Sequence, residues 1–514
     1  MILTAQTTKL LVELFILGSF VFCKGNKATP PHIVLVFADD LGFNDVSWHN
    51  PQVLMPNLQS LAENGVILEQ AYAQQLCTPS RAAMLTGYYP VSIGMQEGVV
   101  TATQIKGLPL NLKLLPEYLQ QVGNYTSYMA GKWHLGFCNT KYTPLGRGFS
   151  KHYGFYNGHI GYYDHMFGET GETAIDYRND TTVNYAAYNK YATTDLTDAA
   201  IEFIENQNPD EPMFLYMAYN APHSPFEVDA KYSNLYTQLR GGKRKIYLGM
   251  ITALDEQVGR LKSALVDRNM WDNTVFVFYS DNGGGTRRNG QSGNNYPLRG
   301  KKDTLWDGGY RVPAFFHSPL LTNSGYSHNG LFHVSDLFAT FVYLASGKDA
   351  YAVPSGIDGM NIWESISDNS VSPRNELVYN IIEHSTSSKP PARVVEQAAI
   401  RYNNYKLIEI DAGVSVGFGG LNDWITPPEN STDVIGTPAN MNAHTIGSYD
   451  YYLFDLEEDP YETNNIAATD ITNLSLMLTR LSAAKGKAVH AIDSTTSDNG
   501  LPSNNGGVWG PGFC

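Results

Sequence analysis

Apolar stretches of two kinds alternate along much of the chain. Residues 32–38 are continuously apolar and rich in β-branched side chains, which predicts a strand buried on both faces. Residues 56–64 instead place Leu58, Leu61 and Ala62 at helical spacing. The same reasoning predicts strands at 66–71, 125–130, 213–219, 275–279 and 311–316, and helices at 112–122, 194–206, 244–269 and 334–345. Because strands and helices alternate from 32 to about 345, we expect an α/β domain with a mostly parallel central sheet flanked by helices.

The pattern changes after about residue 390. Residues 399–402 and 405–408 flank Asn403 and Asn404, which is typical of a β-hairpin. A helix at about 472–485 would pack on the resulting sheet. We therefore expect a large domain at 24–390, a smaller α+β domain with an antiparallel sheet at 391–493, and a loose tail rich in Gly, Asn and Ser at 494–514.

The N-terminal segment has the features of a secretory signal peptide. Lys9 precedes a short apolar run that ends near Cys23, and only Glu13 interrupts it, so we assign residues 1–23 to the signal. A membrane anchor is the alternative, but the uncharged part is shorter than the roughly 20 residues that a spanning helix needs. Four glycosylation sequons agree with the secretory pathway: Asn124, Asn179, Asn430 and Asn473. The expected location is a lysosome or the extracellular space, without stable membrane insertion.

Composition and net charge exclude some classes of protein. Hydrophobic residues make up 43% of the chain and charged residues 17%, which indicates a globular protein. The formal net charge is −15, and no block of Lys and Arg is present, so nucleic-acid binding is not expected. An anionic substrate would have to be attracted by cations placed locally.

Acidic and amide side chains follow two of the predicted buried strands. Asp39 and Asp40 come directly after the first strand, and Asp281 and Asn282 follow the strand at 275–279. Open α/β sheets bind their ligands at the carboxyl ends of strands. A solvated turn or a helix cap is the alternative interpretation of each pair.

A cysteine introduces the next short helix. The segment 77–81 reads Cys-Thr-Pro-Ser-Arg and continues into an apolar run that ends at Gly87. Pro79 suits the first helical position and Thr78 the N-cap, which would place Cys77 against a helix N-terminus, where an anion is favoured. A lone cysteine can equally be a small buried hydrophobic residue.

Cationic residues follow further strands. The strand at 125–130 leads into Gly-Lys-Trp-His-Leu-Gly, and Lys132 and His134 point the same way if this stretch is extended. His223 lies between two prolines after the strand at 213–219, where a stiff turn suits a positioned acid or base. Lys301 and Lys302 follow Gly300. Each residue alone has an ordinary structural explanation.

Taken together, these motifs resemble the type I, formylglycine-dependent sulfatases from about residue 31 to 485, and their order is closest to the arylsulfatase B-like (N-acetylgalactosamine-4-sulfatase) members. The resemblance implies an alkaline-phosphatase-like large domain. It also implies hydrolysis of sulfate esters by a formylglycine hydrate made from Cys77, through a covalent sulfo-enzyme intermediate. A formylglycine-generating enzyme would act on the chain during synthesis, and the substrate would be a sulfated small molecule or glycan.

The resemblance assigns a role to each motif. The metal ligands would be Asp39, Asp40, modified Cys77, Asp281 and Asn282. This all-oxygen set suits a hard cation, Ca²⁺ or Mg²⁺, and it disfavours zinc. The resemblance implies one Ca²⁺ ion. The catalytic residues would be Cys77, Arg81, Lys132, His134, His223 and Lys302. Among these, the lysines and His223 would hold the sulfate, and either His223 or Lys302 would protonate the leaving alcohol. Arg81 and Lys132 would steady the hydrate, and His134 would take a proton from it.

With Cys77 used by the sulfatase motif and Cys23 beside the signal, Cys138 and Cys514 are left as a possible disulfide pair. The rim of the substrate pocket is expected from loops at 153–191, 287–297 and 411–445.

Two other functions stay open. One is a phosphodiesterase or phosphatase of the same superfamily. The other is a non-catalytic secreted protein that binds sulfated glycans. The sequence leaves the sulfate position and the oligomeric state undetermined.

Overall fold

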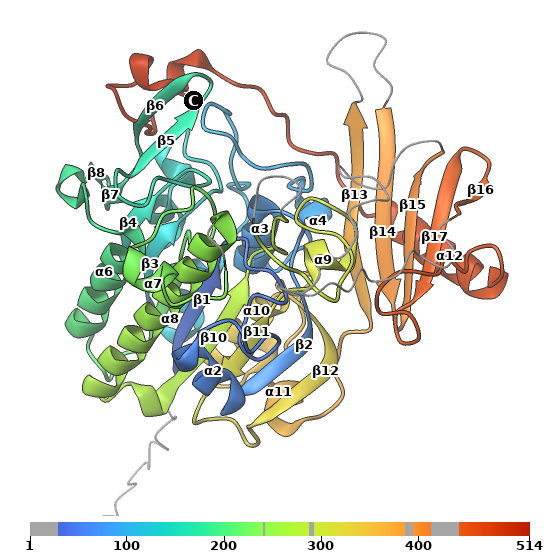
Figure 1. Cartoon of the computed structure of the whole chain (residues 1–514), viewed down its shortest axis with the longest axis horizontal. Helices are drawn as coiled ribbons and strands as arrows, with labels where there is room; N and C mark the ends of the chain where they lie inside the picture. The colour runs from blue at the N-terminus through green and yellow to red at the C-terminus, as the bar shows by residue number, and fades with distance from the viewer. Residues whose placement is uncertain (1–28, 240–241, 287–291, 386–393, 413–441) are drawn as a thin grey trace, which may run out of the picture.

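The computed structural model describes residues 29–239, 242–286, 292–385, 394–412 and 442–514 (Figure 1). They form a large α/β domain and a smaller domain on an antiparallel sheet, as the sequence predicts. The predicted signal peptide at 1–23 lies outside the described residues. Within these residues, no helix combines the length and apolar character that crossing a membrane requires.

The large domain is built on a ten-stranded sheet. Its five central strands run parallel and lie in the order β10 (Thr274–Ser280), β1 (His32–Ala38), β9 (Met213–Ala218), β3 (Thr126–Lys132) and β4 (Lys151–Phe155). Every residue of β1, β9 and β10 is buried, as expected for strands covered on both faces.

The outer strands add antiparallel pairs at both edges. One edge continues through β11 (Ala314–His317), β2 (Val66–Tyr72) and β12 (Tyr326–His333), and the other through β7 (Arg178–Asn179) and β8 (Thr182–Val183). The sequence did not predict β12, because polar residues at 328–330 interrupt its apolar pattern and its register shifts there. The segment expected to be irregular at 153–191 also holds a small ribbon of β5 (Met166–Glu169) and β6 (Glu172–Ile175).

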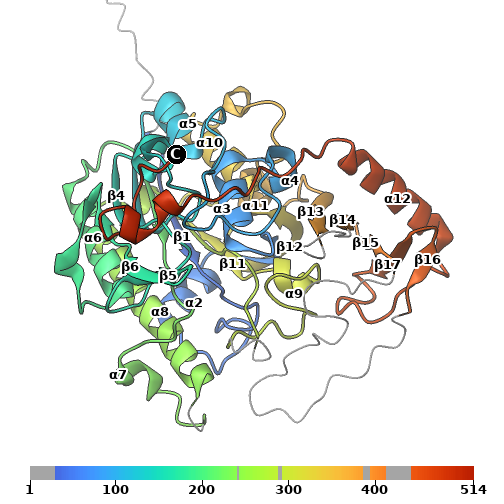
Figure 2. The same ribbon diagram turned by 90° about the horizontal axis from the view of Figure 1, so that it is seen from above.

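Helices cover both faces of the sheet (Figure 2). On one side α2, α6 and α7 pack on the long helix α8, and on the other side α10 packs on α3 and α5. The helices of the large domain are α2 (Pro56–Glu63), α3 (Cys77–Thr86), α4 (Pro90–Ile93), α5 (Leu115–Gly123), α6 (Ala192–Asn206), α7 (Ala230–Ser233), α8 (Lys243–Asp267), α9 (Asp307–Tyr310), α10 (Asp336–Ala345) and α11 (Trp363–Asp368).

The small domain is a five-stranded antiparallel sheet covered by one helix. Its strands lie in the order β13 (Glu376–Ser385), β14 (Val394–Tyr402), β15 (Tyr405–Asp411), β17 (Tyr449–Asp455) and β16 (His444–Ile446), and α12 (Ile471–Lys485) packs on β14 and β15. The predicted hairpin around residues 403 and 404 is confirmed as β14–β15. β13 precedes residue 390, the expected domain boundary, and yet it pairs within the small sheet.

The C-terminal tail is an ordered strap, so the expectation of a loose tail at 494–514 is wrong. It leaves α12, crosses above α3 and α4, passes beside β6, and then returns to Cys138 (Figure 2). Trp509 is fully buried, and a disulfide joins Cys514 to Cys138. Backbone hydrogen bonds also tie the strap to the loop after α4, from Ile105 to Thr495 and from Ser497 to Thr103. Its Gly- and Asn-rich composition hid these anchors, because few of the residues are apolar.

A buried polar network joins the two domains. The carboxylate of Asp307, at the start of α9, accepts hydrogen bonds from Tyr72 (2.7 Å), from Tyr379 of β13 (2.7 Å) and from Lys406 of β15 (2.9 Å). Lys406 also pairs with Glu462 at 2.6 Å, and Glu462 accepts a hydrogen bond from the Asp307 amide. Because these groups are buried and mutually bonded, the network fixes how the small sheet meets the large domain.

Candidate active site

The acidic residues of the site lie at the carboxyl ends of two neighbouring strands. Asp39 and Asp40 directly follow β1, and Asp281 and Asn282 directly follow β10. The last residues of these strands pair in parallel register, so the two acidic segments are side by side. The Asp40 amide donates to Asp281 Oδ1 at 3.2 Å, across the two segments.

Cys77 reaches this edge of the sheet from the first position of α3. The predicted start at Pro79, with Thr78 as N-cap, is wrong. Leu76 is the N-cap, because its backbone is extended (φ −143°, ψ 156°) and its carbonyl accepts the first backbone hydrogen bond of the helix. The Thr78 hydroxyl instead donates to the carbonyl of His134 at 2.8 Å, which ties the helix to the segment after β3.

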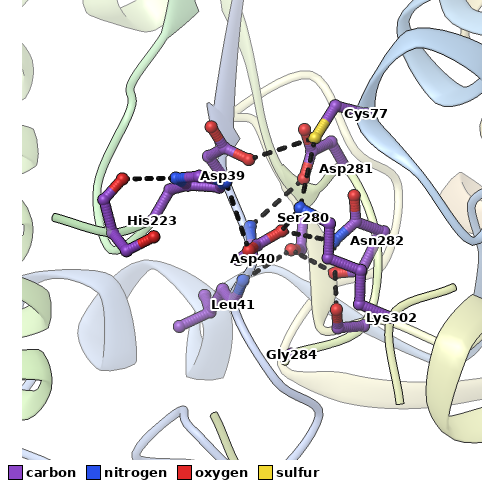
Figure 3. A network of polar contacts seen from close by, with 12 residues as sticks. Asp39, Asp40, Leu41, Cys77, His223, Ser280, Asp281, Asn282, Gly284 and Lys302 are labelled. Carbon is purple, nitrogen blue, oxygen red and sulfur yellow. Dashed lines mark hydrogen bonds and ion pairs between the residues drawn. The ribbon is translucent and has the colours of Figure 1, made fainter. Parts of the chain in front are cut away.

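The four strand-end residues and Cys77 form one buried cluster (Figure 3). One potential ligand atom from each of Asp39, Asp40, Cys77 and Asp281 lies within 4.8 Å of the others. The Asn282 amide nitrogen donates to Asp40 Oδ1 at 2.7 Å, while its Oδ1 is buried without a hydrogen-bond partner in the described part of the chain. Converging carboxylates and an unpartnered amide oxygen are a donor set that fits a hard divalent cation.

Two lysines neutralise the first acidic pair. Lys132 Nζ lies 2.7 Å from Asp39 Oδ2, and both side chains are fully buried. Lys302 Nζ lies 2.5 Å from Asp40 Oδ1 and 3.5 Å from Cys77 Sγ, and its side chain is 19% exposed. Lys302 is therefore the cation beside Cys77 that also reaches the surface.

Arg81 pairs with the remaining aspartate. Its Nε and Nη2 donate to Asp281 Oδ2 at 3.2 and 2.8 Å, and its Nη1 donates to the Lys132 carbonyl and to the Tyr216 hydroxyl. Arg81 is thus held rigidly by four hydrogen bonds. In this geometry it orders Asp281 and Lys132, and no hydrogen bond joins it to Cys77 in the described residues.

His223 faces the second aspartate. Its Nε2 lies 3.6 Å from Asp40 Oδ2, and its Nδ1 lies 2.5 Å from the Ser224 carbonyl. A carbonyl can only accept a hydrogen bond, so Nδ1 carries the proton in this contact and Nε2 is the nitrogen that faces the site.

His134 lies at the turn after β3, with a left-handed backbone (φ 58°). Its Nδ1 is buried without a hydrogen-bond partner among the described residues. Burial, with Lys132 and Arg81 adding to it, lowers the pKa of His134 well below its usual value. The imidazole is therefore neutral and can accept a proton.

Burial of Cys77 suppresses an ordinary thiolate. Burial raises the pKa of the Cys77 thiol to about 12; Asp281 adds to this effect, and Lys132 and Lys302 oppose it. Burial alone would also raise the pKa of Asp40, but Lys302 and His223 outweigh it and hold that pKa below its usual range. An unmodified cysteine here is a protonated thiol next to a carboxylate.

Several residues of the site were missed by sequence reasoning. Tyr216 holds Arg81, and Ser280 accepts a hydrogen bond from the Leu41 amide at 3.2 Å and donates to the Asn282 carbonyl at 2.9 Å. His159 stacks on His223, with ring centroids 5.3 Å apart. Tyr216 and Ser280 lie inside apolar strands, and His159 lies in a polar loop, so no local pattern distinguishes them.

A cavity of about 360 Å³ separates this region from the small sheet. Its lining includes Leu76 and Asp303, the chain neighbours of Cys77 and Lys302, and Ile382 and Gln397 from β13 and β14. Of the loops expected at the pocket rim, most of 411–445 and the segment 287–291 lie outside the described residues.

Three of the predicted glycosylation sequons can be placed. Asn124 and Asn179 are exposed, whereas Asn473 is half-buried and donates to the Asp470 side chain at 2.8 Å. Asn430 lies outside the described residues. The disulfide that the sequence left open joins Cys138 and Cys514, with Cα atoms 5.4 Å apart.

Comparison with known proteins agrees with this geometry. The family model described as Sulfatase matches residues 31–347. The chain is 34% identical to arylsulfatase J of Mus musculus over 94% of this chain and 80% of the relative. It is 33% identical to N-acetylgalactosamine-6-sulfatase of Homo sapiens over 65% of each protein.

Among solved structures, the crystal structure of Ps i-CgsB in complex with k-i-k-neocarrahexaose superposes with a TM-score of 0.71 and 28% identity, and covers 90% of this chain and 94% of that one. These relatives carry different sulfatase names, so they do not single out the arylsulfatase B-like subgroup. The chain belongs to the sulfatase family and is a sulfuric ester hydrolase.

Proposed function

We propose that this chain hydrolyses sulfate esters with a formylglycine made from Cys77 and one divalent cation bound by Asp39, Asp40, Asp281 and Asn282. The observation that carries the proposal is the convergence of these ligand atoms on Cys77 within a ring of paired cations. A structural ion-pair network would not need a cysteine at its centre or an amide oxygen without a partner.

The donor chemistry favours Ca²⁺. Carboxylate and amide oxygens without a histidine or a thiolate suit a hard ion, and Ca²⁺ accepts irregular geometry more readily than Mg²⁺. When bound, the ion supplies positive charge that stabilises the negative charge developing on the transferred sulfate. Asn282 contributes its unpartnered Oδ1 to this site.

The surroundings of residue 77 disfavour a thiolate, which fits a side chain that acts as formylglycine and not as a cysteine. When present, the formylglycine hydrate supplies a hydroxyl nucleophile for the sulfur and a second hydroxyl that allows sulfate to leave. The chain's own residues do the rest. Arg81 fixes the Asp281 carboxylate next to residue 77, and Lys302 Nζ, 3.5 Å from Cys77 Sγ, places a cation where the sulfate would lie.

Proton transfer is assigned to the two histidines. His134 is neutral and buried, which suits it to take a proton from residue 77. His223 Nδ1–H donates to the Ser224 carbonyl and Nε2 faces the site, so Nε2, once protonated, is the atom that gives a proton to the leaving alcohol. Lys302 is the competing donor, since its side chain also reaches the surface.

The substrate is proposed to be a sulfated glycan or a small aryl sulfate. The support is the identity to arylsulfatase J and to N-acetylgalactosamine-6-sulfatase, and the cavity between Leu76 and β13–β14 that could receive the alcohol part. The Cys138–Cys514 disulfide supports passage through the secretory pathway, because disulfides persist in oxidising compartments.

The direct test is mass spectrometry of the tryptic peptide that contains Cys77, together with turnover of 4-nitrocatechol sulfate and of 4-nitrophenyl phosphate. We expect formylglycine at position 77, dominant sulfatase turnover, and no turnover by Cys77→Ala with an unchanged unfolding midpoint. Dominant phosphatase turnover would favour the phosphatase alternative. Unmodified cysteine in protein from a host with the converting enzyme would favour the glycan-binding alternative.

A further inference from the structure

One tripeptide, Asn157–Gly158–His159, touches both histidines of the site. Gly158 lies flat against His134, so that a Cβ at this position would be only 2.8 Å from His134 Cε1. The next ring, His159, stacks on His223 at 5.3 Å with an interplanar angle of 21°. The two histidines to which we assign proton transfer are therefore both bounded by the same loop.

The His159 ring is held by aromatic contacts. In the described part of the chain it makes no hydrogen bond, and it is only half-buried. Phe167 of β5 meets it edge to face at 5.0 Å and 68°. The imidazole of His159 thus contacts both Phe167 and His223, which suits a ring that fixes its neighbour's position.

The C-terminal strap contacts Phe167, the ring that meets His159. Trp509 contacts Phe167 edge to face at 5.6 Å and donates from Nε1 to the Phe167 carbonyl at 2.9 Å. Arg178 donates to the Trp509 carbonyl and to Asp176, and Asp176 accepts from the Asn157 amide at 2.7 Å. Ring contacts and a polar chain therefore both connect the strap to the tripeptide.

His223 needs such support because its own hydrogen bonding leaves it free to turn. Among the described residues, one hydrogen bond, from Nδ1 to the Ser224 carbonyl, holds one edge of the ring, and Nε2 is 3.6 Å from Asp40 Oδ2. If the His223 ring turned while it kept this hydrogen bond, Nε2 would move out of line with the leaving alcohol. Displacing a reacting group by about 1 Å can reduce a rate roughly 100-fold.

We propose that His159 is a positioning residue of the sulfatase reaction, which holds the imidazole plane of His223 by stacking and is itself held by Phe167 and the C-terminal strap. This inference rests on the proposed function of His223. In this role the flat ring of His159 positions His223, and the nitrogen atoms of His159 are not needed.

Two substitutions separate these parts. His159→Ala removes the ring, and His159→Phe keeps a flat ring without nitrogen atoms. With formylglycine verified in each protein, we expect His159→Ala to lower kcat for 4-nitrocatechol sulfate about 10- to 100-fold with KM changed less than about twofold. His159→Phe should recover most of the lost kcat. Tyr185→Ala, at a side chain that is 66% exposed, is the matched control and should behave as wild type.

Unchanged kcat in His159→Ala would overturn the proposal. So would a His159→Phe variant as slow as His159→Ala with raised KM, because that result would make His159 a direct substrate contact. Wild-type protein that carries formylglycine and yet lacks sulfatase turnover would overturn the proposed function instead.

A crystal structure of His159→Ala decides the inference in every case. We expect the His223 ring to rotate or to occupy two conformers, and to return to one conformer in His159→Phe. A single unmoved His223 ring in His159→Ala would show that stacking does not position it.

Discussion

At the scale of single residues, the site pairs each buried aspartate with a cation. Asp39 pairs with Lys132, Asp40 with Lys302, and Asp281 with Arg81. Buried charges are costly unless they are paired, so each of these cations contributes to the stability of the fold as well as to the proposed reaction. Both roles have to be measured when one of these residues is replaced.

Arg81 gives the clearest prediction of this kind. Arg81→Ala leaves Asp281 buried without its partner, and breaking a buried pair typically costs about 3–5 kcal/mol. We expect the free energy of unfolding in urea to fall by about that amount, measured without added metal. Tyr216→Phe, which removes only one acceptor of the same guanidinium, should lose about 0.5–1.5 kcal/mol. Equal losses in the two variants would contradict the assigned role of the Arg81–Asp281 pair.

A substitution at Asn282 tests the proposed metal site without changing its charge. Asn282→Leu removes Oδ1 at nearly constant volume and leaves all three aspartates in place. We expect Ca²⁺ affinity, measured by calorimetry on protein stripped with a chelator, to fall roughly 10-fold or more, since even outer-shell changes cost that much. Added Ca²⁺ should then raise the unfolding temperature of wild type more than that of the variant. Asn273→Leu, on the 3₁₀ turn before β10, is a matched control.

Residues that belong to contiguous motifs could be placed from the sequence. Cys77, Lys132 and Lys302 stand in short segments whose spacing is visible along the chain, and the fold brings them together. Tyr216 and His159 could not be placed, because their roles come from contacts between segments far apart in sequence.

At the scale of elements, the parallel register of β1 and β10 does most to position the acidic residues of the site. Continuous apolar runs predicted these strands, and their shared direction puts both acidic segments at one edge. The sequence did not predict that β11 runs antiparallel to its neighbours β10 and β2, because an apolar run does not encode the direction of its neighbour. The sequence did not predict an ordered strap, because the strap is anchored by one tryptophan and one disulfide within a polar stretch.

Trp509 provides the element-scale prediction. Its side chain is fully buried between the strap and β5, so Trp509→Ala leaves a large cavity, and such substitutions cost about 3–5 kcal/mol. We expect thermal unfolding to begin at lower temperature and proteolysis of the strap to become faster while α12 and the small sheet stay intact. Val489→Ala, at a side chain that is 44% exposed earlier in the strap, should change stability by less than about 0.5 kcal/mol. Unchanged proteolysis in Trp509→Ala would mean that the strap is held mainly by its disulfide.

At the scale of the whole molecule, the two domains meet through charges that the sequence did not reveal. Residues 307, 406 and 462 lie far apart along the chain and become one buried network only after both sheets form. The hydrophobic pattern predicted two domains and their classes. It did not predict that a lysine from the small sheet would bridge two carboxylates at their junction.

This junction makes stability depend on pH. Burial, strengthened by Asp307 and opposed by Lys406, raises the pKa of Glu462 to about 7. The folded state therefore binds this proton more tightly than the unfolded state, so the contribution of Glu462 to stability is complete below its unfolded pKa of about 4.5 and is lost as pH rises toward 7. We expect wild type to lose on the order of 1–3 kcal/mol through this group between pH 4.5 and 7.5.

Glu462→Gln mimics the protonated acid and isolates the effect. We expect its urea-unfolding free energy to change less between pH 4.5 and 7.5 than that of wild type, with the two proteins nearest each other at pH 4.5. Glu63→Gln, at an exposed carboxylate in α2, should keep the wild-type pH dependence. A Glu462→Gln profile parallel to wild type would mean that Lys406 keeps Glu462 ionised throughout this range, and that the junction carries two carboxylates on one lysine.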